Sequence, residues 1–273
     1  MLNDITLGQF FPVNSPVHKL DPRVKIMSSL AYIIAVFFAK GFAGYLFVAV
    51  FTYSVILMSK VPLKLYLKGL KPLIFIIIFT SAINLFMTDG KIAQIGGIPL
   101  KFGIFKITVE GIDTAVKMTL RLIFLVAGTS VLTFTTSPIV LTDGIESLLS
   151  PFKKIGVPAH ELAMMMSIAI RFIPTLLEET DKIMKAQASR GADFENGSVI
   201  KRIKALVPIL VPLFISSFRR ADELALAMEC RCYTGDDRKR THLVKFQLRP
   251  ADFSALGIVL VLIAAAVLLN GVK

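Results

Sequence analysis

Cysteine is scarce in this sequence, and its scarcity excludes a fold held together by disulfides. The two cysteines, Cys230 and Cys232, are separated by a single residue, and two side chains so close on a helix cannot form a normal disulfide. No cleavable signal peptide is expected either, because the first twenty residues are of mixed character and contain two prolines. Membrane insertion would therefore depend on the first apolar helix itself.

The motifs of nucleotide and metal chemistry are missing too. No G-x-x-x-x-G-K-[ST] loop occurs, so the chain cannot hydrolyse ATP by a P-loop mechanism on its own. His160 and Glu161 begin a zinc-protease pattern, but Met164 stands where the second histidine is required. A metal site at Cys230 and Cys232 would need further ligands, which their neighbourhood does not supply. We therefore expect no catalytic residue, no metal and no cofactor, and a chain that is not an enzyme.

Long apolar runs, by contrast, are abundant. A bilayer core about 30 Å thick is crossed by roughly 17–25 residues of helix. Five runs with few or no charges are candidates, namely residues 26–39, 41–59, 72–88, 122–142 and 253–272. The first run is short, but Lys25 and Lys40 at its ends can reach the membrane interfaces. The runs predict an all-α integral membrane protein with about five transmembrane helices.

The net charge of +12 is distributed in a way that indicates orientation rather than nucleic-acid binding. With the amino terminus inside, the cytoplasmic stretches 1–25, 60–71 and 137–250 hold 3, 4 and 17 lysines and arginines, and the outer stretches hold five. This asymmetry follows the positive-inside rule. The loop 60–71 is the strongest evidence for it, because the rule applies to short loops more than to long segments. We expect a multi-pass protein of a prokaryotic cell membrane with a cytoplasmic N-terminus and no nucleic-acid partner.

These patterns divide the chain into three regions. Residues 1–136 are predicted to form a transmembrane region with four spans, of which the fourth ends near Thr136, and residues 251–273 a C-terminal transmembrane helix. Between them, residues 137–250 are predicted to be a cytoplasmic helical region. Outside the membrane, residues 89–111 favour a loop or small hairpin, because they contain glycine–proline turn signals and β-forming residues.

The cytoplasmic region has charged residues yet keeps a strong apolar periodicity. Ser137 and Pro138 favour the start of a short helix that ends near Lys154. A second, amphipathic helix is expected from about Pro158 to Arg190, and a third from about Lys201 to Arg231. Within the third, the charge-free stretch 205–218 is 14 residues long. We expect it to be buried against other helices or to lie at the membrane interface, not to form a sixth span.

The ends of the second and third helices resemble each other at an interval of 41 residues. In each, one arginine stands between two small residues: Ser189-Arg190-Gly191 and Cys230-Arg231-Cys232. Small neighbours allow a partner surface to approach the backbone, and the guanidinium offers forked hydrogen bonds to a carboxylate. Cations near helix C-termini also complement the helix dipole. This alternative stays open, although the repetition of the pattern favours a binding role.

At this point the sequence resembles a known family, the transmembrane T component of energy-coupling factor (ECF) transporters, which import vitamins and transition metals in prokaryotes. The resemblance covers roughly residues 16–270 and keeps the order and spacing of the family's motifs. The segments that carry it are His18–Lys25, Thr135–Pro138, Gly156–Pro158, Arg171–Pro174, Ala186–Gly191, Ala221–Ala225 and Cys230–Tyr233.

The resemblance implies a role and a set of partners. In the family, the two small–Arg–small ends belong to coupling helices, which sit in grooves of two ATP-binding-cassette ATPase subunits. Closure of these subunits is transmitted to a separate substrate-binding membrane subunit. Arg190 and Arg231 are therefore the expected ATPase contacts, together with their small neighbours. The family's second motif usually has glycine where this chain has Cys232, so the backbone freedom of glycine is lost there.

Other classes of protein remain to be weighed against this reading. A membrane-embedded hydrolase would need two polar catalytic groups facing one cavity within the spans, and a secondary transporter would need ionisable residues at mid-membrane in paired half-repeats; the spans show neither pattern. Glu178 and Glu179 lie on a charged helix turn and are expected to be solvated. Lys117 and Arg121 are expected near the outer end of the fourth span, where they either extend to the interface or contact another subunit.

Overall fold

A computed structural model describes residues 10–88, 94–95, 98–99, 101–102, 105–106, 108–192, 194, 198–233 and 246–268. Its described residues form two compact units. The first unit comprises residues 10–144 and 246–268, and the second comprises residues 145–233.

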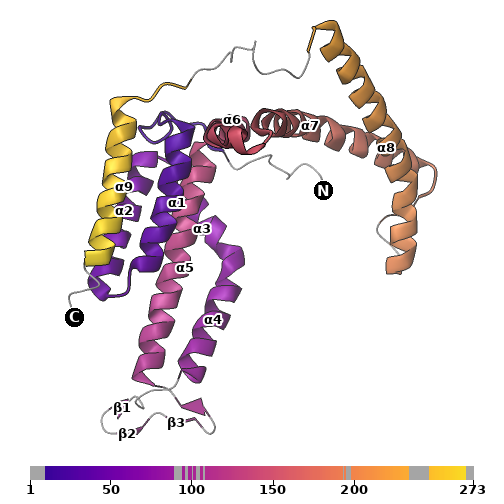
Figure 1. Ribbon diagram of the computed structural model, residues 1–273. Helices are drawn as coiled ribbons and strands as arrows, with labels where there is room; N and C mark the ends of the chain where they lie inside the picture. Colours follow the sequence, from indigo (N-terminus) through magenta and orange to yellow (C-terminus); the bar gives the residue numbers. More distant parts are fainter. Residues whose placement is uncertain are drawn as a thin grey trace. The chain divides into compact units, whose positions relative to one another are not determined.

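The first unit is a bundle of helices in which α5 occupies a central position (Figure 1). Its helices are α1 (Pro22–Phe38), α2 (Phe42–Ser59), α3 (Leu63–Leu70), η1 (Lys71–Leu73), α4 (Ile74–Met87), α5 (Val109–Thr135), most of α6 (Pro138–Leu149) and α9 (Pro250–Leu268). Helix α1 packs along α9 and α5, and α4 packs along α5. Segments from the two ends of the chain therefore lie side by side in one bundle.

Two very short antiparallel strand pairs connect α4 to α5. They are β1 (Gln94–Ile95) with β2 (Ile98–Pro99), and β3 (Lys101–Phe102) with β4 (Phe105–Lys106). The small hairpin expected in this stretch is therefore present, in duplicate. With four strands of two residues each against long helices, the chain is an all-α membrane protein.

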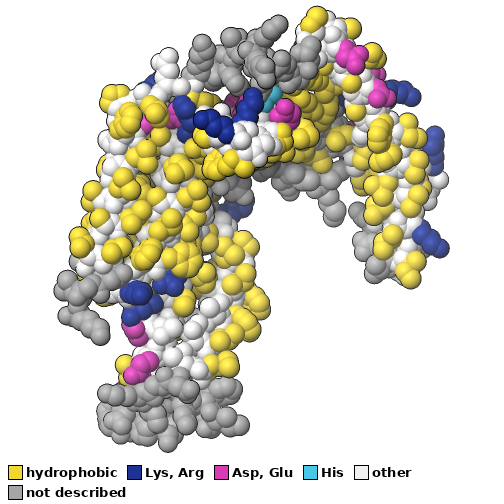
Figure 2. All heavy atoms as spheres, viewed as in Figure 1, with side chains coloured by type: hydrophobic (Ala, Val, Ile, Leu, Met, Phe, Trp, Pro, Cys, Tyr) yellow, Lys and Arg dark blue, Asp and Glu magenta, His cyan; other side chains and the backbone are white. Residues whose placement is uncertain are grey.

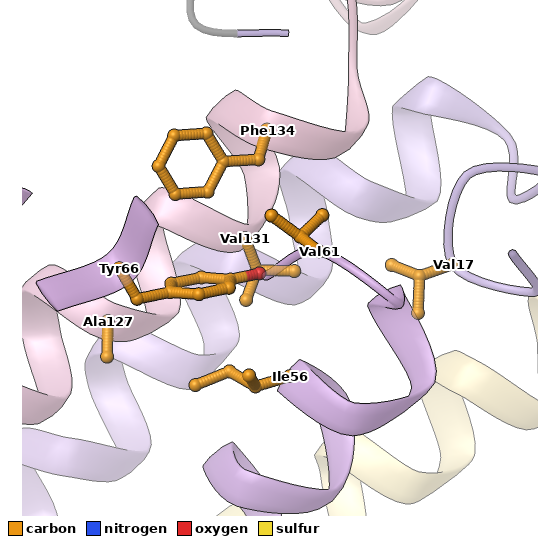
Figure 3. Packing of buried hydrophobic residues seen from close by; sticks show 7 residues of the cluster. All are labelled: Val17, Ile56, Val61, Tyr66, Ala127, Val131 and Phe134. Atoms are coloured by element: carbon orange, nitrogen blue, oxygen red, sulfur yellow. The ribbon is translucent and has the colours of Figure 1, made fainter. Parts of the chain in front are cut away.

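An apolar cluster at one end of the bundle joins the loops to the helices. It contains Val17, Ile56, Val61, Tyr66, Ala127, Val131 and Phe134 (Figure 3). The rings of Tyr66 and Phe134 meet edge to face with centroids 5.0 Å apart, a favoured geometry for aromatic pairs. The Tyr66 hydroxyl shares a hydrogen bond with the Ser59 hydroxyl at 3.1 Å, so its polar end is satisfied within the core.

The segment His18–Lys25, one of the motifs noted in the sequence, joins α1 to α5 and α9. The buried carboxylate of Asp252 accepts from the Asp21 amide at 2.8 Å and from the Arg249 amide at 2.7 Å. Lys25 Nζ donates to the carbonyl oxygens of His18 at 3.0 Å and Thr135 at 2.9 Å. The side chains of Lys25, in this motif, and of Asp252, in α9, thus satisfy backbone groups that three helix ends would otherwise leave buried and unpaired.

The helix boundaries follow from the capping residues and prolines at the helix ends. The Asp21 side chain caps α1 by accepting from the Arg23 amide, and Pro22 occupies the first helical position. The predicted end of the fourth span near Thr136 is confirmed, because α5 ends at Thr135 and α6 begins at Pro138. Helix α5 begins at Val109, so it includes Lys117 and Arg121, as expected, and it starts within the stretch 89–111 that was expected to be a loop or small hairpin.

Among the residues that the structure describes, five helical segments are long and apolar enough to cross a membrane, as many as predicted, but the set differs in one member. They are α2, the continuous α3–α4 segment, α5, α7 (Ala159–Ser189) and α9. Helix α1 has 17 residues and is marginally short, whereas α7 qualifies by its 31 residues and its composition.

The second unit consists of the end of α6, the turn η2 (Ser150–Ile155), α7 and α8 (Val199–Cys230). The helices predicted over residues 158–190 and 201–231 are confirmed to within two residues at each end. The stretch 205–218 lies within α8 and is mostly exposed, with Ile209 its one buried residue. Within its own unit, this stretch is therefore not buried against other helices over most of its length.

Candidate partner-binding site

Helix α7 ends in a Schellman motif with Arg190 at the cap. Gly191 adopts a left-handed conformation with φ of +87°, and its amide donates to the Ala188 carbonyl at 2.9 Å. The Ala192 amide donates to the Gln187 carbonyl at 3.1 Å. These two bonds define the motif and satisfy carbonyls that the helix end would otherwise leave open.

Helix α8 ends in the same motif, 41 residues later. The Cys232 amide donates to the Glu229 carbonyl at 2.8 Å, and the Tyr233 amide donates to the Met228 carbonyl at 3.0 Å. Cys232 has φ of +58°, so a cysteine takes the left-handed position that glycine occupies in α7. The substitution of cysteine for glycine, expected to remove backbone freedom, therefore leaves the geometry of the helix end unchanged.

The two arginines consequently occupy equivalent places. Arg190 and Arg231 are the cap residues of matching helix ends, and both are exposed, as are the small residues on either side of them. No hydrogen bond or ion pair ties either guanidinium to the part of the chain that the structure describes. Each helix end thus presents one unengaged, forked cation beside a closely approachable backbone.

Helices α7 and α8 cross each other (Figure 1), and the contacts between them set their direction. The Ser216 hydroxyl donates to the carboxylate of Glu179, and eight residues further along α7 the Gln187 side-chain amide donates to the Pro208 carbonyl at 3.4 Å. From the first contact to the second, the residue number rises by eight on α7 and falls by eight on α8. The two helices are therefore antiparallel where they meet.

An ion pair marks the crossing. Arg220 Nη2 lies 3.0 Å from Glu179 Oε2, and these two residues are separated by 41 positions, the interval of the repeat. Equivalent points of the two helices therefore meet. Arg190 and Arg231 each follow their member of the ion pair by 11 residues, about 16 Å of helix. Because the helices are antiparallel, the two arginine ends point away from the crossing in opposite senses.

Sequence reasoning missed this crossing. The expectation that Glu179 is solvated is wrong, because its carboxylate binds both Ser216 and Arg220 across the helix pair. Glu178 is exposed, as expected. The 41-residue interval between Glu179 and Arg220 is the sequence signal that links the two residues, although it does not tell which faces of the helices meet.

The charged pair in α5 lies apart from this site, in the first unit. Lys117 forms an ion pair with Asp113 one turn earlier. The Arg121 guanidinium lies over the ring of Phe37, 5.5 Å from its centroid, and Phe37 is the penultimate residue of α1. Arg121 is therefore level with the end of α1, where a cation can reach a membrane interface.

The amino-acid sequence is similar to those of known membrane transport proteins. A family model described as "CbiQ: Cobalt transport protein" matches residues 13–243. The energy-coupling factor transporter transmembrane protein EcfT of Clostridium kluyveri is 56% identical over 268 residues, which are 98% of this chain and 97% of that protein. This chain belongs to the family of energy-coupling factor transporter transmembrane proteins.

Further members of the EcfT family extend the comparison. The EcfT protein of Acidaminococcus fermentans is 58% identical over 243 residues, covering 89% of this chain and 88% of that protein. The EcfT protein of Bacillus subtilis is 45% identical over 264 residues, covering 97% of each. The resemblance noted from the motifs is confirmed, and the chain is the transmembrane component of an energy-coupling factor transporter.

Proposed function

We propose that this chain is the coupling subunit of an ECF importer for a vitamin or a transition-metal ion. It joins two ATP-binding-cassette ATPase subunits to a separate substrate-binding membrane subunit and transmits the motion of the first to the second. The chain itself carries out no chemistry. It lies in the cell membrane with its N-terminus and the α7–α8 unit on the cytoplasmic side.

The observation that carries this proposal is the matched pair of helix ends. Two identical or similar ATPase subunits related by a two-fold axis need two equivalent attachment points. Arg190 and Arg231 fit that requirement, because they cap identical Schellman motifs at equal distances from the crossing of α7 and α8. The exposed backbone and small side chains beside each arginine suit insertion into a groove, and the guanidinium suits a groove carboxylate.

The apolar surface of α8 supports the proposal of a second partner, the substrate-binding membrane subunit. Large apolar side chains remain exposed along its length, including Leu206, Leu210, Phe214, Ile215 and Phe218. A surface of this kind in a protein that works at a membrane marks an interaction site. We assign it to the substrate-binding membrane subunit, whose transmembrane helices supply a matching apolar surface.

Purification in mild detergent, followed by mass-spectrometric identification of the chains that remain bound, tests this function. The expected result is two ATPase subunits and one further membrane protein for each copy of this chain. The reconstituted complex should import substrate only when ATP is supplied. If the chain purifies alone and imports substrate by itself in liposomes, the coupling role is wrong and a secondary transporter replaces it.

A further inference from the structure

A pocket of about 460 Å³ lies among α1, α2, α5 and α9 in the first unit. This volume lies within the range of pockets that hold organic ligands, and it far exceeds the small voids of a well-packed interior. Its wall is almost entirely apolar. Three wall residues, Val50, Met58 and Ile258, are exposed by 58%, 53% and 57%. The pocket therefore opens sideways, onto the surface that spanning helices present to lipid.

One hydroxyl in the wall has no partner. Ser28 Oγ is buried and makes no hydrogen bond with the residues that the structure describes. Other wall hydroxyls behave differently, since those of Ser29, Thr52 and Ser54 each donate to a carbonyl of their own helix at 2.7 to 2.9 Å. A buried hydroxyl without such a hydrogen bond requires an explanation, and a bound ligand that accepts or donates the bond supplies one.

A cation lies at one end of the same pocket. Lys25 lines it, is only 8% exposed and stands in the first turn of α1. Of the three N–H donors of its ammonium group, two are used by the carbonyl oxygens of His18 and Thr135. One donor is left for an acceptor at the end of the pocket where the spanning helix begins, and the ammonium group also lies within electrostatic reach of the buried carboxylates of Asp21 and Asp252.

We propose that this pocket binds one acyl chain of an anionic phospholipid, with the phosphate of its headgroup at Lys25. An apolar slot that opens sideways to lipid and ends at a cation matches the two halves of such a molecule. The lining also disfavours a passage for a polar cargo, because the hydroxyls of Ser29, Tyr32, Thr52, Ser54 and Thr135 are already bonded within the protein. This inference does not depend on the partners proposed above.

The direct test is to count the lipids that stay bound to the full-length chain. The protein is reconstituted in vesicles of equal parts phosphatidylglycerol and phosphatidylethanolamine, extracted, washed extensively in lipid-free detergent and analysed by native mass spectrometry. We expect about one phosphatidylglycerol per chain. Attraction of one headgroup to one lysine predicts enrichment of about fivefold over phosphatidylethanolamine. A parent protein that retains no phospholipid, or both lipids equally, contradicts the proposal.

A second test fills the pocket with a larger side chain and measures lipid retention again. Ser54→Phe places a ring in the slot from an exposed position on α2, and we expect it to lower lipid retention at least fivefold. Thr129→Phe, at an exposed position of α5 outside the pocket, is the matched control and should retain the parent's lipid. Ser28→Leu fills the slot from α1 and provides the same test if Ser54→Phe does not fold. Retention of lipid by a folded filled variant, or equal loss in Thr129→Phe, overturns the assignment.

Discussion

Glu179 and Arg220 are bonded to each other at 3.0 Å across two helices, and they are separated by the same 41 positions that separate Arg190 from Arg231. This relationship links an internal repeat in the sequence to a near-symmetric crossing in space. The ion pair fixes where the helices cross, and the crossing fixes where the two arginine ends lie. A substitution in the ion pair should therefore change the positions of both arginine ends.

The first prediction concerns this ion pair. Glu179→Ala leaves Arg220 and Ser216 without their acceptor, and we expect a loss of about 1 kcal/mol in the free energy of unfolding of the α7–α8 unit. The measurement is a double-mutant cycle with Arg220→Ala by thermal unfolding in detergent. Lys185→Ala, which removes an exposed pair with Asp181 within α7, is the matched control and should cost less than about 0.5 kcal/mol. Equal losses at the two pairs would refute a special role for the crossing.

The second prediction concerns the two left-handed residues. A side chain in this conformation costs roughly 1–2 kcal/mol relative to glycine. Cys232→Gly should therefore stabilise the end of α8, and Gly191→Ala should destabilise the end of α7. Amide hydrogen exchange at Tyr233 and Ala192, whose amides close the two motifs, should slow in the first variant and quicken in the second. A change of 1 kcal/mol corresponds to about fivefold in rate, and shifts of the same sign in both variants would contradict the cap assignment.

The third prediction is topological. Cys230 and Cys232 are exposed in the structure, so the unaltered chain reports on the α7–α8 unit directly. With that unit inside, an impermeant thiol reagent should label these cysteines only after the membrane is opened. Gly41→Cys, in the turn between α1 and α2 of a chain whose native cysteines are replaced by serine, should react in intact cells. Labelling of Cys230 or Cys232 in intact cells would reverse the proposed orientation.

The fourth prediction follows from the missing P-loop. The purified chain should have no ATPase activity, and liposomes that contain it alone should accumulate no vitamin or metal ion when ATP is added. Addition of the two ATPase subunits and the substrate-binding subunit should restore both activities. ATP hydrolysis by the chain alone, with activity that follows it through purification, would show that a nucleotide site exists outside the known loop motif.

The sequence predicted helices well where their ends are chemically marked. Pro138 and Gly191 mark such points, because proline favours a first helical position and glycine a left-handed cap. The start of α5 at Val109 was expected slightly too late, because the β-forming residues before it favoured a loop or hairpin up to residue 111.

Contacts between elements were harder to predict. The repeat placed Arg190 and Arg231 at equivalent helix ends, but periodicity alone does not tell which faces of two helices meet. The pairing of Glu179 with Arg220 therefore came only from the structure. Likewise, nothing in the residue type of Cys232 indicates a left-handed backbone, which the hydrogen bonds of the helix end impose.

The most direct test of the coupling role is the effect of reversing the charge at the two caps. If each arginine fills a groove and pairs with a carboxylate, its loss costs roughly 2–5 kcal/mol of binding, whereas an exposed cation that only complements a helix dipole contributes about 0.3–1 kcal/mol. We therefore expect Arg190→Glu and Arg231→Glu each to weaken assembly at least thirtyfold, the factor for about 2 kcal/mol. Arg→Lys at either cap should also be impaired, because an ammonium group cannot form the planar fork.

The measurement is a pull-down of ATPase subunits combined with substrate uptake, for the single variants, the double variant and Lys204→Glu, an exposed cation of α8 away from the caps. The double variant should lose both assembly and uptake while its membrane helices stay folded, and Lys204→Glu should behave as the parent. Near-normal assembly and uptake in the double variant would contradict the account.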